Sequence, residues 1–435
     1  MTSAQTLIDT AVLGARWLNL ERPRLGRARR SASGRHLALF ASALPPSSNV
    51  GVQRPLSFMR YACSVGWRVD AFCSEPPPTQ RQHGDELMAR VPREATLHVV
   101  HESSRHPSYR LFPRVDGDFR NALAYASRAI DAMASDPPDI VMASGPRFFT
   151  FVAALFVARR FGAPLVLDYR DEWTECPFEF VQKDGSDLAW ERRCLRHADA
   201  VLFTTESHRE HQLATFPELV PQKAHLVSNG WDPDEYVGPP GASKGAAHGK
   251  LSLGYLGSLA GQTPPHDFLA SLEQLLIDEP EWIERIHVRF IGRRGLRAEE
   301  AIRAFRFPEV LEIIDHVGKR EAIRRMQESD ALLLLTGEGF KRYLPAKLFE
   351  YLAARRPVLV YGVPGEASQL VEQLGAGVLC RPGSARALRD ALLRLSSLDM
   401  SLNDATIEQW LREHERPALA ARAFAILEPL GAFVT

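Results

Sequence analysis

The sequence predicts an α/β protein built from two doubly wound domains, each with a parallel sheet covered by helices on both faces. Three observations lead to this prediction. From residue 36 onwards, short and nearly continuous apolar runs alternate with helical stretches, as in buried parallel strands. Residues 238–249 (GPPGASKGAAHG) have the composition of a linker and split this pattern into two series. The length of 435 residues suits two or three domains.

Residues 1–35 precede the alternating pattern and form an extension. Residues 4–20 are typical of one amphipathic helix, whose apolar positions are Leu7, Ile8, Ala11, Val12, Trp17 and Leu18. A basic stretch follows, with Arg22, Arg24, Arg27, Arg29, Arg30 and Arg35. A helix followed by clustered arginines is compatible with a peripheral contact with an anionic membrane face. The alternative is an extension that docks on the protein or is loosely ordered.

The first series of strands predicts an N-terminal domain over residues 36–237. Its strands are expected at 36–42, 67–73, 96–100, 139–143, 164–168, 200–204 and 225–227, with a helix at 57–65. The apolar stretch at 148–158 is well short of the ~20 residues that cross a bilayer, so it indicates a buried helix.

The second series predicts a C-terminal domain over residues 250–435. Its strands are expected at 251–256, 287–291, 311–314, 331–335 and 357–361, with helices at 267–277, 319–328 and 345–354. Doubly wound sheets bind ligands beyond the carboxyl ends of their strands. Two such sheets facing each other would place a site in the cleft between the domains.

Composition excludes several classes of protein. Lys and Arg number 53, as do Asp and Glu, so net charge offers no general attraction to nucleic acid. The five cysteines form no C-x-x-C pair, which fits a reducing compartment. The absence of a secretory signal makes the cytoplasm the expected location. No P-loop and no G-x-G-x-x-G fingerprint occurs, which disfavours ATP hydrolysis of that type and a nicotinamide dehydrogenase.

The segment 344–358 (LPAKLFEYLAARRPV) is the strongest candidate for a ligand-binding or catalytic segment. Pro345 suits the first turn of a helix. Lys347 and Glu350 are three residues apart, so they lie on one helix face. An ammonium near a helix N-terminus can bind phosphate, and a carboxylate one turn later can accept hydrogen bonds from a ribose diol. The spacing alone also fits an ordinary surface ion pair.

Several strings together resemble the GT-B glycosyltransferases of family 4, a large retaining group. The segment 344–358 resembles the donor-binding helix, P-x-K-x-x-E-Y-L-A followed by R-P-V. Further similar strings are 44–54 (LPPSSNVGVQR), 166–173 (VLDYRDEW), 199–205, 227–232 (VSNGWD), 254–257 (GYLG), 290–293 (FIGR) and 375–377 (GAG). Their order and spacing cover about residues 36–395. The fold implied is two Rossmann-like domains facing across a cleft.

The resemblance implies sugar transfer from a nucleoside-diphosphate sugar to an acceptor hydroxyl, with retention and with neither metal nor cofactor. The acceptor would be a glycan, a lipid-linked sugar or a small molecule. Asp171 and Lys347 are the expected catalytic residues. The expected donor ligands are Gly51, Gly257, Ser258, Arg293, Lys347, Leu348 and Glu350. The expected acceptor ligands are Arg54, Asp168, Arg170 and Trp173, although Arg170 and Asp171 could instead brace their loop and Trp173 could lie in the core.

The sequence departs from the family at one important position. An earlier glutamate, which usually faces the donor sugar, would fall at residue 342, and Arg342 stands there. Glu338 could replace it. Residues 258–265 also lack the Arg and Lys that usually face the diphosphate, so Lys347 and Arg293 or Arg294 would have to neutralise it. A non-catalytic nucleotide- or glycan-binding protein and a nucleotide-sugar 2-epimerase therefore remain alternatives.

Two motifs that suggest metal binding have ordinary explanations. Asp232 and Asp234 form a D-x-D string, but it follows an Asn-Gly turn at a domain boundary. His208 and His211 lie one turn apart on an expected helix, and no third ligand is evident. We therefore expect no metal site.

Overall fold

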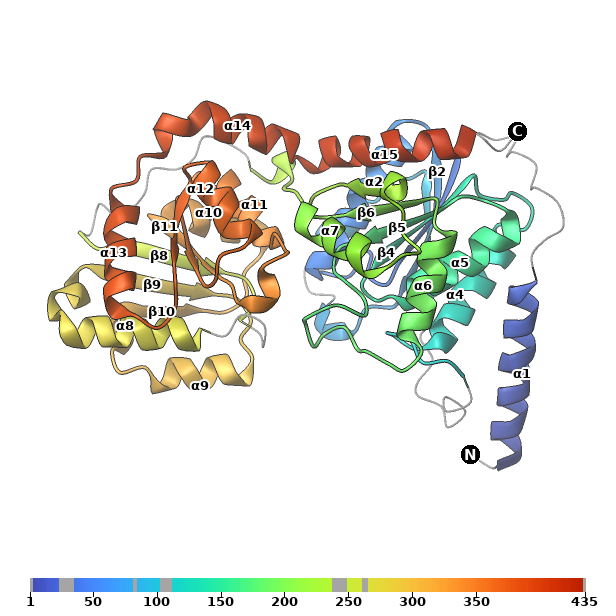
Figure 1. Cartoon of the computed structure of the whole chain (residues 1–435), viewed down its shortest axis with the longest axis horizontal. Helices are drawn as coiled ribbons and strands as arrows, with labels where there is room; N and C mark the ends of the chain where they lie inside the picture. The colour runs from blue at the N-terminus through green and yellow to red at the C-terminus, as the bar shows by residue number, and fades with distance from the viewer. Residues whose placement is uncertain are drawn as a thin grey trace. The chain divides into compact units, whose positions relative to one another are not determined.

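The computed structural model describes residues 3–22, 35–80, 84–101, 112–236, 249–259 and 265–432. Contacts divide the chain into two units (Figure 1): unit 1 is Met1–Ser228 with Leu419–Thr435, and unit 2 is Asn229–Ala418. Each unit holds one parallel sheet with helices on both faces, as the sequence predicts. Nearly all of the linker at 238–249 lies outside the described residues.

The sheet of unit 1 has seven strands in the order β3-β2-β1-β4-β5-β6-β7. All pairs are parallel, with Leu37 opposite both Val69 and Ile140. The strands are β1 (His36–Ala41), β2 (Arg68–Ser74), β3 (Ala95–Val100), β4 (Ile140–Gly145), β5 (Leu165–Tyr169), β6 (Ala200–Phe203) and β7 (Ala224–Leu226). The strand order reverses between β1 and β4, so the loops after β1, β4 and β5 meet at the carboxyl edge where such sheets bind ligands.

Helices cover both faces of this sheet (Figure 1). Leu56 and Phe58 of one helix and Phe424 of another join the buried core beneath one face. A second group packs helix on helix against the other face. The helices of unit 1 are α1 (Ser3–Glu21), α2 (Gln53–Ser64), α3 (Gly84–Met88), α4 (Phe119–Ala132), α5 (Phe149–Phe161), α6 (Asp187–His197), α7 (Glu206–Thr215) and α15 (Arg416–Ala432).

Helix α5 confirms the buried helix predicted from the apolar stretch at 148–158. Eleven of its residues are buried, and Gly162 ends it in the left-handed conformation that glycine adopts readily. Among the described residues, no helix combines the length and the apolar character that a membrane span requires.

The N-terminal helix α1 docks on α4 and α5. The Trp17 ring packs edge-on against Phe119 with 5.0 Å between centroids. The Glu21 carboxylate pairs with Arg159 at 2.8 Å and with Arg193 at 2.5 Å. Helix α1 is therefore docked on unit 1 through Trp17 and Glu21, while Val12 and Leu18 stay exposed. Most of the basic stretch, residues 23–34, lies outside the described part of the chain.

The sheet of unit 2 has six parallel strands in the order β10-β9-β8-β11-β12-β13. They are β8 (Leu251–Leu256), β9 (Ile286–Ile291), β10 (Leu311–Ile314), β11 (Ala331–Leu335), β12 (Val358–Tyr361) and β13 (Gly377–Cys380). The bounds predicted for β8, β10 and β11 are confirmed. The sequence analysis missed the edge strand β13, which pairs with β12.

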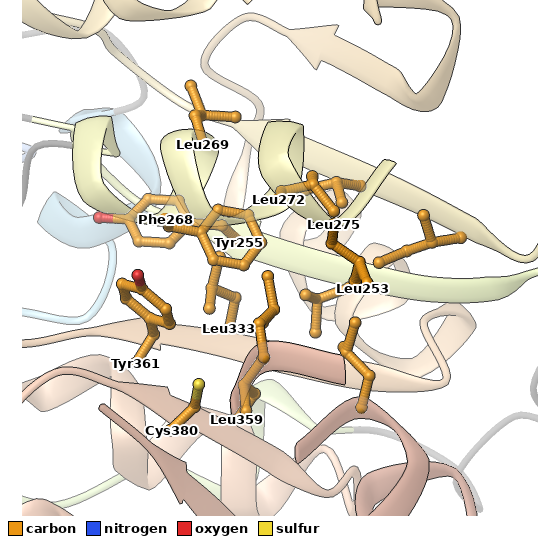
Figure 2. Packing of buried hydrophobic residues seen from close by; sticks show 14 of the residues in the cluster. Leu253, Tyr255, Phe268, Leu269, Leu272, Leu275, Leu333, Leu359, Tyr361 and Cys380 are labelled. Carbon is orange, nitrogen blue, oxygen red and sulfur yellow. The ribbon is translucent and has the colours of Figure 1, made fainter. Parts of the chain in front are cut away.

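Two buried clusters hold the helices of unit 2 on the faces of this sheet. Figure 2 shows one of them, in which Tyr255, Phe268 and Tyr361 pack with leucines from the strands and from α8. The helices are α8 (His266–Asp278), α9 (Leu296–Ala304), α10 (Lys319–Glu328), α11 (Ala346–Ala353), α12 (Glu366–Gln373), α13 (Ala385–Ser396) and α14 (Asp404–Glu413).

The last helix changes the predicted domain boundary. The sequence predicts a first domain over 36–237 and a second over 250–435. The contacts instead begin unit 2 at Asn229 and place residues from Leu419 onwards in unit 1. The reason is apolar burial, because Leu419, Ala423, Phe424 and Leu427 join the core beneath β1 and β2.

Candidate active site

Helix α11 carries the strongest sequence motif, and its bounds follow from its residues. Pro345 is the N-cap, with the extended ψ of 135°. Leu348, Phe349, Tyr351 and Leu352 form the buried face. Lys347 and Glu350 are only partly buried, so both are accessible at the carboxyl edge of the sheet.

Lys347 is held over the end of β8 by Tyr255. Its Nζ donates a hydrogen bond to the Tyr255 phenol oxygen at 2.6 Å and lies 4.1 Å from the ring centroid. The same phenol donates to the backbone oxygen of Ser258 at 2.9 Å. Tyr255 itself is fully buried, so the strand fixes the position of the ammonium.

Gly257 lies directly beneath this ammonium. Its φ of 126° is one that side chains rarely adopt, and a Cβ there would be 3.3 Å from Lys347 Nζ. The structure thus brings together three predicted donor ligands, Gly257, Ser258 and Lys347. The Gly257 N–H donates to the Ile291 oxygen at 2.9 Å, so it takes part in the sheet.

Glu350 is held at both its side chain and its backbone. Its Oε1 accepts a short hydrogen bond from Lys319 Nζ. Lys319 Nζ is also 3.3 Å from a carboxylate oxygen of Glu235. The backbone oxygen of Glu350 accepts from the Tyr236 phenol at 3.1 Å. A carboxylate that one cation restrains on one oxygen can present its other oxygen to a hydroxyl pair.

The other predicted donor residues differ in their accessibility. Arg293 follows β9 and is exposed. Arg294 is engaged, at 2.7 Å from Glu299 and 2.6 Å from Asp315. The Leu348 prediction is wrong for its side chain, which is fully buried in the core, and its N–H donates to the Pro345 oxygen at 2.9 Å.

The position that departs from the family lies after β11. Arg342 is partly buried in the turn that leads to α11. Glu338, the suggested substitute, is exposed and pairs with Lys341 at 2.6 Å.

In unit 1, Arg54 and Asp168 form a buried ion pair. Arg54 donates to both Asp168 carboxylate oxygens at 2.8–3.1 Å. It also donates to the backbone oxygens of Ser228 at 2.5 Å and Val227 at 2.7 Å. Ser144 donates to Asp168 at 2.7 Å. The two residues predicted to bind acceptor therefore bind each other, and the pair braces the ends of β5 and β7.

Arg170 links the loops at the carboxyl edge of the same sheet. It donates to the backbone oxygens of Gly145 at 2.5 Å, Gly51 at 2.6 Å and Pro146 at 2.9 Å. A Cβ at Gly51 would be 2.6 Å from Arg170 Nη1. A side chain at 51 would therefore displace the guanidinium that holds the loop after β1.

Asp171, one of the two predicted catalytic residues, has a raised pKa. It directly follows Arg170 and is partly buried. Burial raises its pKa from 3.8 to about 6, and Arg170 opposes this shift. A carboxylate with this pKa is mostly ionised at neutral pH and close enough to titration to exchange a proton.

The prediction that Trp173 contacts the acceptor is wrong. Its side chain is 0 % exposed. Its ring stacks on Phe148 at 5.2 Å and contacts Phe151 edge-on. Aromatic packing in the core therefore occupies the ring that was expected to stack on a sugar.

The motifs that suggest metal binding have structural roles. Asp232 is buried, and its side chain accepts from the Asp234 N–H at 3.1 Å in a helical turn. His208 packs against Phe203 and Tyr169. Within the described ranges, no group of three or more potential ligands could hold a metal ion.

Sequence reasoning missed Tyr255, Lys319 and Glu235. Tyr255 lay within the quoted string 254–257, but its buried strand position suggested packing. Lys319 opens a helix with no recognised motif. Only their contacts with Lys347 and Glu350 mark them as part of the site.

Two family models match much of the chain. A family model described as Glycosyl transferase 4-like domain matches residues 52–230, and one described as Glycosyl transferases group 1 matches residues 250–397. No curated protein sequence matches the chain.

Solved structures resemble the chain over most of its length. A sucrose-phosphate synthase from Thermosynechococcus elongatus is 14 % identical, with a TM-score of 0.70, covering 92 % of this chain and 100 % of that one. HepE of Anabaena in complex with UDP is 12 % identical, with a TM-score of 0.64, covering 91 % and 100 %. A trehalose-6-phosphate protein from E. coli bound with UDP-2-fluoro glucose is 11 % identical, with a TM-score of 0.64, covering 91 % and 99 %. At these identities the structures share the fold.

Proposed function

Because the chain belongs to the glycosyltransferases of the GT-B fold, we propose that it transfers a sugar from a nucleoside-diphosphate sugar to an acceptor hydroxyl. The family resemblance supports retention of configuration and a reaction without metal or cofactor. Unit 2 binds the donor and unit 1 binds the acceptor, which is a glycan, a lipid-linked sugar or a small molecule.

The observation that carries this proposal is the placement of Lys347. Its ammonium is held by Tyr255 at the end of β8, next to Gly257. When the bond between the sugar and the diphosphate breaks, negative charge develops on the diphosphate oxygen. A fixed ammonium stabilises that charge without having to reorganise, and the exposed Arg293 adds a second cation.

Glu350 and Asp171 complete the proposed chemistry. The carboxylate of Glu350 accepts hydrogen bonds from the ribose hydroxyls. Asp171 orients the acceptor hydroxyl or takes its proton as the new bond to the sugar forms, since it is ionised above pH about 6. Arg170 holds the loops beside Asp171 in place.

Nucleotide binding is the first test of this function. Because similar structures were solved with UDP or UDP-2-fluoro glucose, UDP is tested first, followed by GDP, ADP, CDP and TDP. A ligand at 100 times its Kd stabilises the folded state by about 2.7 kcal/mol. We expect one diphosphate to raise Tm in the wild type and Glu350→Gln to lose most of that shift. Glu321→Gln, on the exposed side of α10, is the control and should keep it.

Turnover separates the alternatives. The partly buried Arg342 at the position of the usual glutamate favours, as a second candidate, a non-catalytic protein that binds nucleotide or glycan. Such a protein would bind a diphosphate and release none from the matching nucleotide sugar. An epimerase would convert the sugar without an acceptor. Release of diphosphate that depends on an acceptor identifies the transferase.

We also propose that the segment 4–35 makes a peripheral contact with an anionic membrane at its inner, cytoplasmic face. Docking through Trp17, Leu20 and Glu21 leaves Val12 55 % and Leu18 67 % exposed. The next residues, 22–35, contain six arginines and no acidic residue. Exposed apolar side chains followed in the sequence by clustered arginines suit a lipid surface that carries negative charge.

A further inference from the structure

Lys319 joins two carboxylates in unit 2. Its Nζ donates to Glu350 Oε1 in a short hydrogen bond and lies 3.3 Å from Glu235. Arg416 Nη1 is 4.0 Å from the same Glu235 carboxylate. Two cations and two anions therefore alternate in one partly buried row, with Glu350 at its end.

The position of Lys319 is unfavourable for the helix that carries it. Lys319 is the first residue of α10 and follows the N-cap Gly318. The N-terminus of a helix has a positive partial charge, so an ammonium there is destabilising unless anions compensate it. Glu350 and Glu235 provide that compensation. The stability of α10 alone therefore does not explain this lysine.

The contact limits the conformations of the Glu350 carboxylate. The backbone of Glu350 is already fixed, because its oxygen accepts from Tyr236 and from the Ala354 N–H at 3.1 and 2.9 Å. The side chain is 21 % exposed and would otherwise be free to rotate towards water. Binding Oε1 to Lys319 leaves Oε2 as the available acceptor.

The ammonium also lowers an electrostatic cost. An anionic carboxylate close to a bound diphosphate would repel it. A lysine hydrogen-bonded to that carboxylate cancels much of the repulsion while the carboxylate can still accept hydrogen bonds.

We propose that Lys319 is a positioning residue that sets the Glu350 carboxylate for the ribose 2′- and 3′-hydroxyls and thereby determines the preference for ribonucleotides. This inference rests on the proposed donor site. Glu235 is the second carboxylate that holds the ammonium.

The test measures discrimination between ribose and deoxyribose. UDP, GDP and ADP are each titrated calorimetrically, together with their 2′-deoxy forms, into the wild type, Lys319→Met and Lys319→Arg. A lost hydrogen bond to a charged group predicts that the wild type binds the preferred ribonucleotide about tenfold more tightly than its deoxy form. Lys319→Met should reduce this ratio to about two or less, and Lys319→Arg should restore most of it.

Two further experiments distinguish a specific positioning role of Lys319 from a nonspecific effect of removing a lysine. The first is Lys250→Met. Lys250 directly precedes β8, has an exposure similar to that of Lys319 and lies 3.3 Å from Glu284. Its loss should leave the ratio of ribonucleotide to deoxyribonucleotide affinity unchanged. Glu350→Gln and Lys319→Met should not be additive, because both abolish the same contact.

The outcomes distinguish this inference from the function on which it rests. If the wild type binds none of the nucleotides, the proposed donor site is overturned and the role of Lys319 with it. If the wild type discriminates and Lys319→Met discriminates equally well, the donor site stands and the role of Lys319 is refuted. Additive losses in the double variant would likewise refute it.

Discussion

Lys347 Nζ lies 2.6 Å from the phenol oxygen of Tyr255 and 4.1 Å from the centre of its ring, although 92 residues separate the two in sequence. The ammonium is thus held both by a hydrogen bond and by the face of an aromatic ring. In the proposed reaction this contact fixes the position from which the Lys347 ammonium binds the diphosphate.

Tyr255→Phe tests this contact. It keeps the ring but removes the hydrogen bond to Lys347, so we expect affinity for the nucleoside diphosphate to fall about fivefold, equivalent to about 1 kcal/mol. Calorimetric titration measures the change. Tyr361→Phe is the control, because its phenol is also hydrogen-bonded, at 2.8 Å to Ser271, in the same cluster (Figure 2). Equal losses of affinity in both variants would mean that Tyr255 affects binding only through the stability of the protein and not through its contact with Lys347.

Asp171→Asn should lower activity and raise stability at alkaline pH. The folded pKa of about 6 exceeds the ordinary value of 3.8, so the folded state favours the neutral acid. The group's favourable contribution to stability is present below pH 3.8 and is lost as pH rises through 6. The variant should therefore be more stable by about 2–3 kcal/mol at pH 8, since each pKa unit corresponds to about 1.4 kcal/mol, and little changed near pH 4. Urea unfolding at the two pH values measures this.

The same residue predicts the acid limb of the rate profile. Wild-type kcat/KM should fall as pH drops below about 6, because the carboxyl becomes protonated. A variant that kept full activity and the same acid limb would rule out Asp171 as the catalytic carboxylate.

Asp168→Asn should destabilise unit 1. It leaves the buried Arg54 guanidinium without its anion, and breaking a buried pair in this way costs about 3–5 kcal/mol. Urea unfolding followed by circular dichroism checks the loss. The control is Arg324→Gln, which breaks an exposed pair with Glu321 and should cost less than about 1 kcal/mol. If Asp168→Asn were as stable as the wild type but bound the acceptor more weakly, Asp168 would instead be an acceptor ligand.

The outward face of α1 is tested with the double variant Val12→Asp, Leu18→Asp. Both side chains are more than half exposed, so Tm should stay within a degree or two while sedimentation with phosphatidylglycerol vesicles is lost. Val65→Asp, Leu188→Asp changes two other exposed apolar side chains of unit 1 and should still bind. Binding by the wild type should weaken with salt. Equal binding by both double variants would contradict the membrane contact.

Much of the architecture could be predicted from local pattern. β11 is a run of five apolar residues, all buried, and its bounds were predicted because a strand buried on both faces needs a continuous apolar run. Helix α15 shows the limit of such reasoning. Its apolar residues indicate burial, but they do not state that the partner is the core of unit 1.

The residues of the candidate site likewise fall into those that the sequence identified and those that it did not. Lys347 and Glu350 were found because they lie three residues apart on one helix. Trp173 and Leu348 were misjudged because a motif does not report which side of an element faces the core. Arg54 and Asp168 were each recognised as charged residues at strand or helix ends, yet only the fold shows that they bind each other across 114 residues of sequence.

The sequence by itself determined two parallel α/β sheets and the helix that presents Lys347 and Glu350. These features depend on periodicity and on the spacing of residues within one element. The tertiary structure decided which charges are engaged and which are accessible, including the contacts of Lys347 with Tyr255 and of Glu350 with Lys319. Such contacts join residues from separate strands and helices, and only the packing of those elements brings them within hydrogen-bond distance.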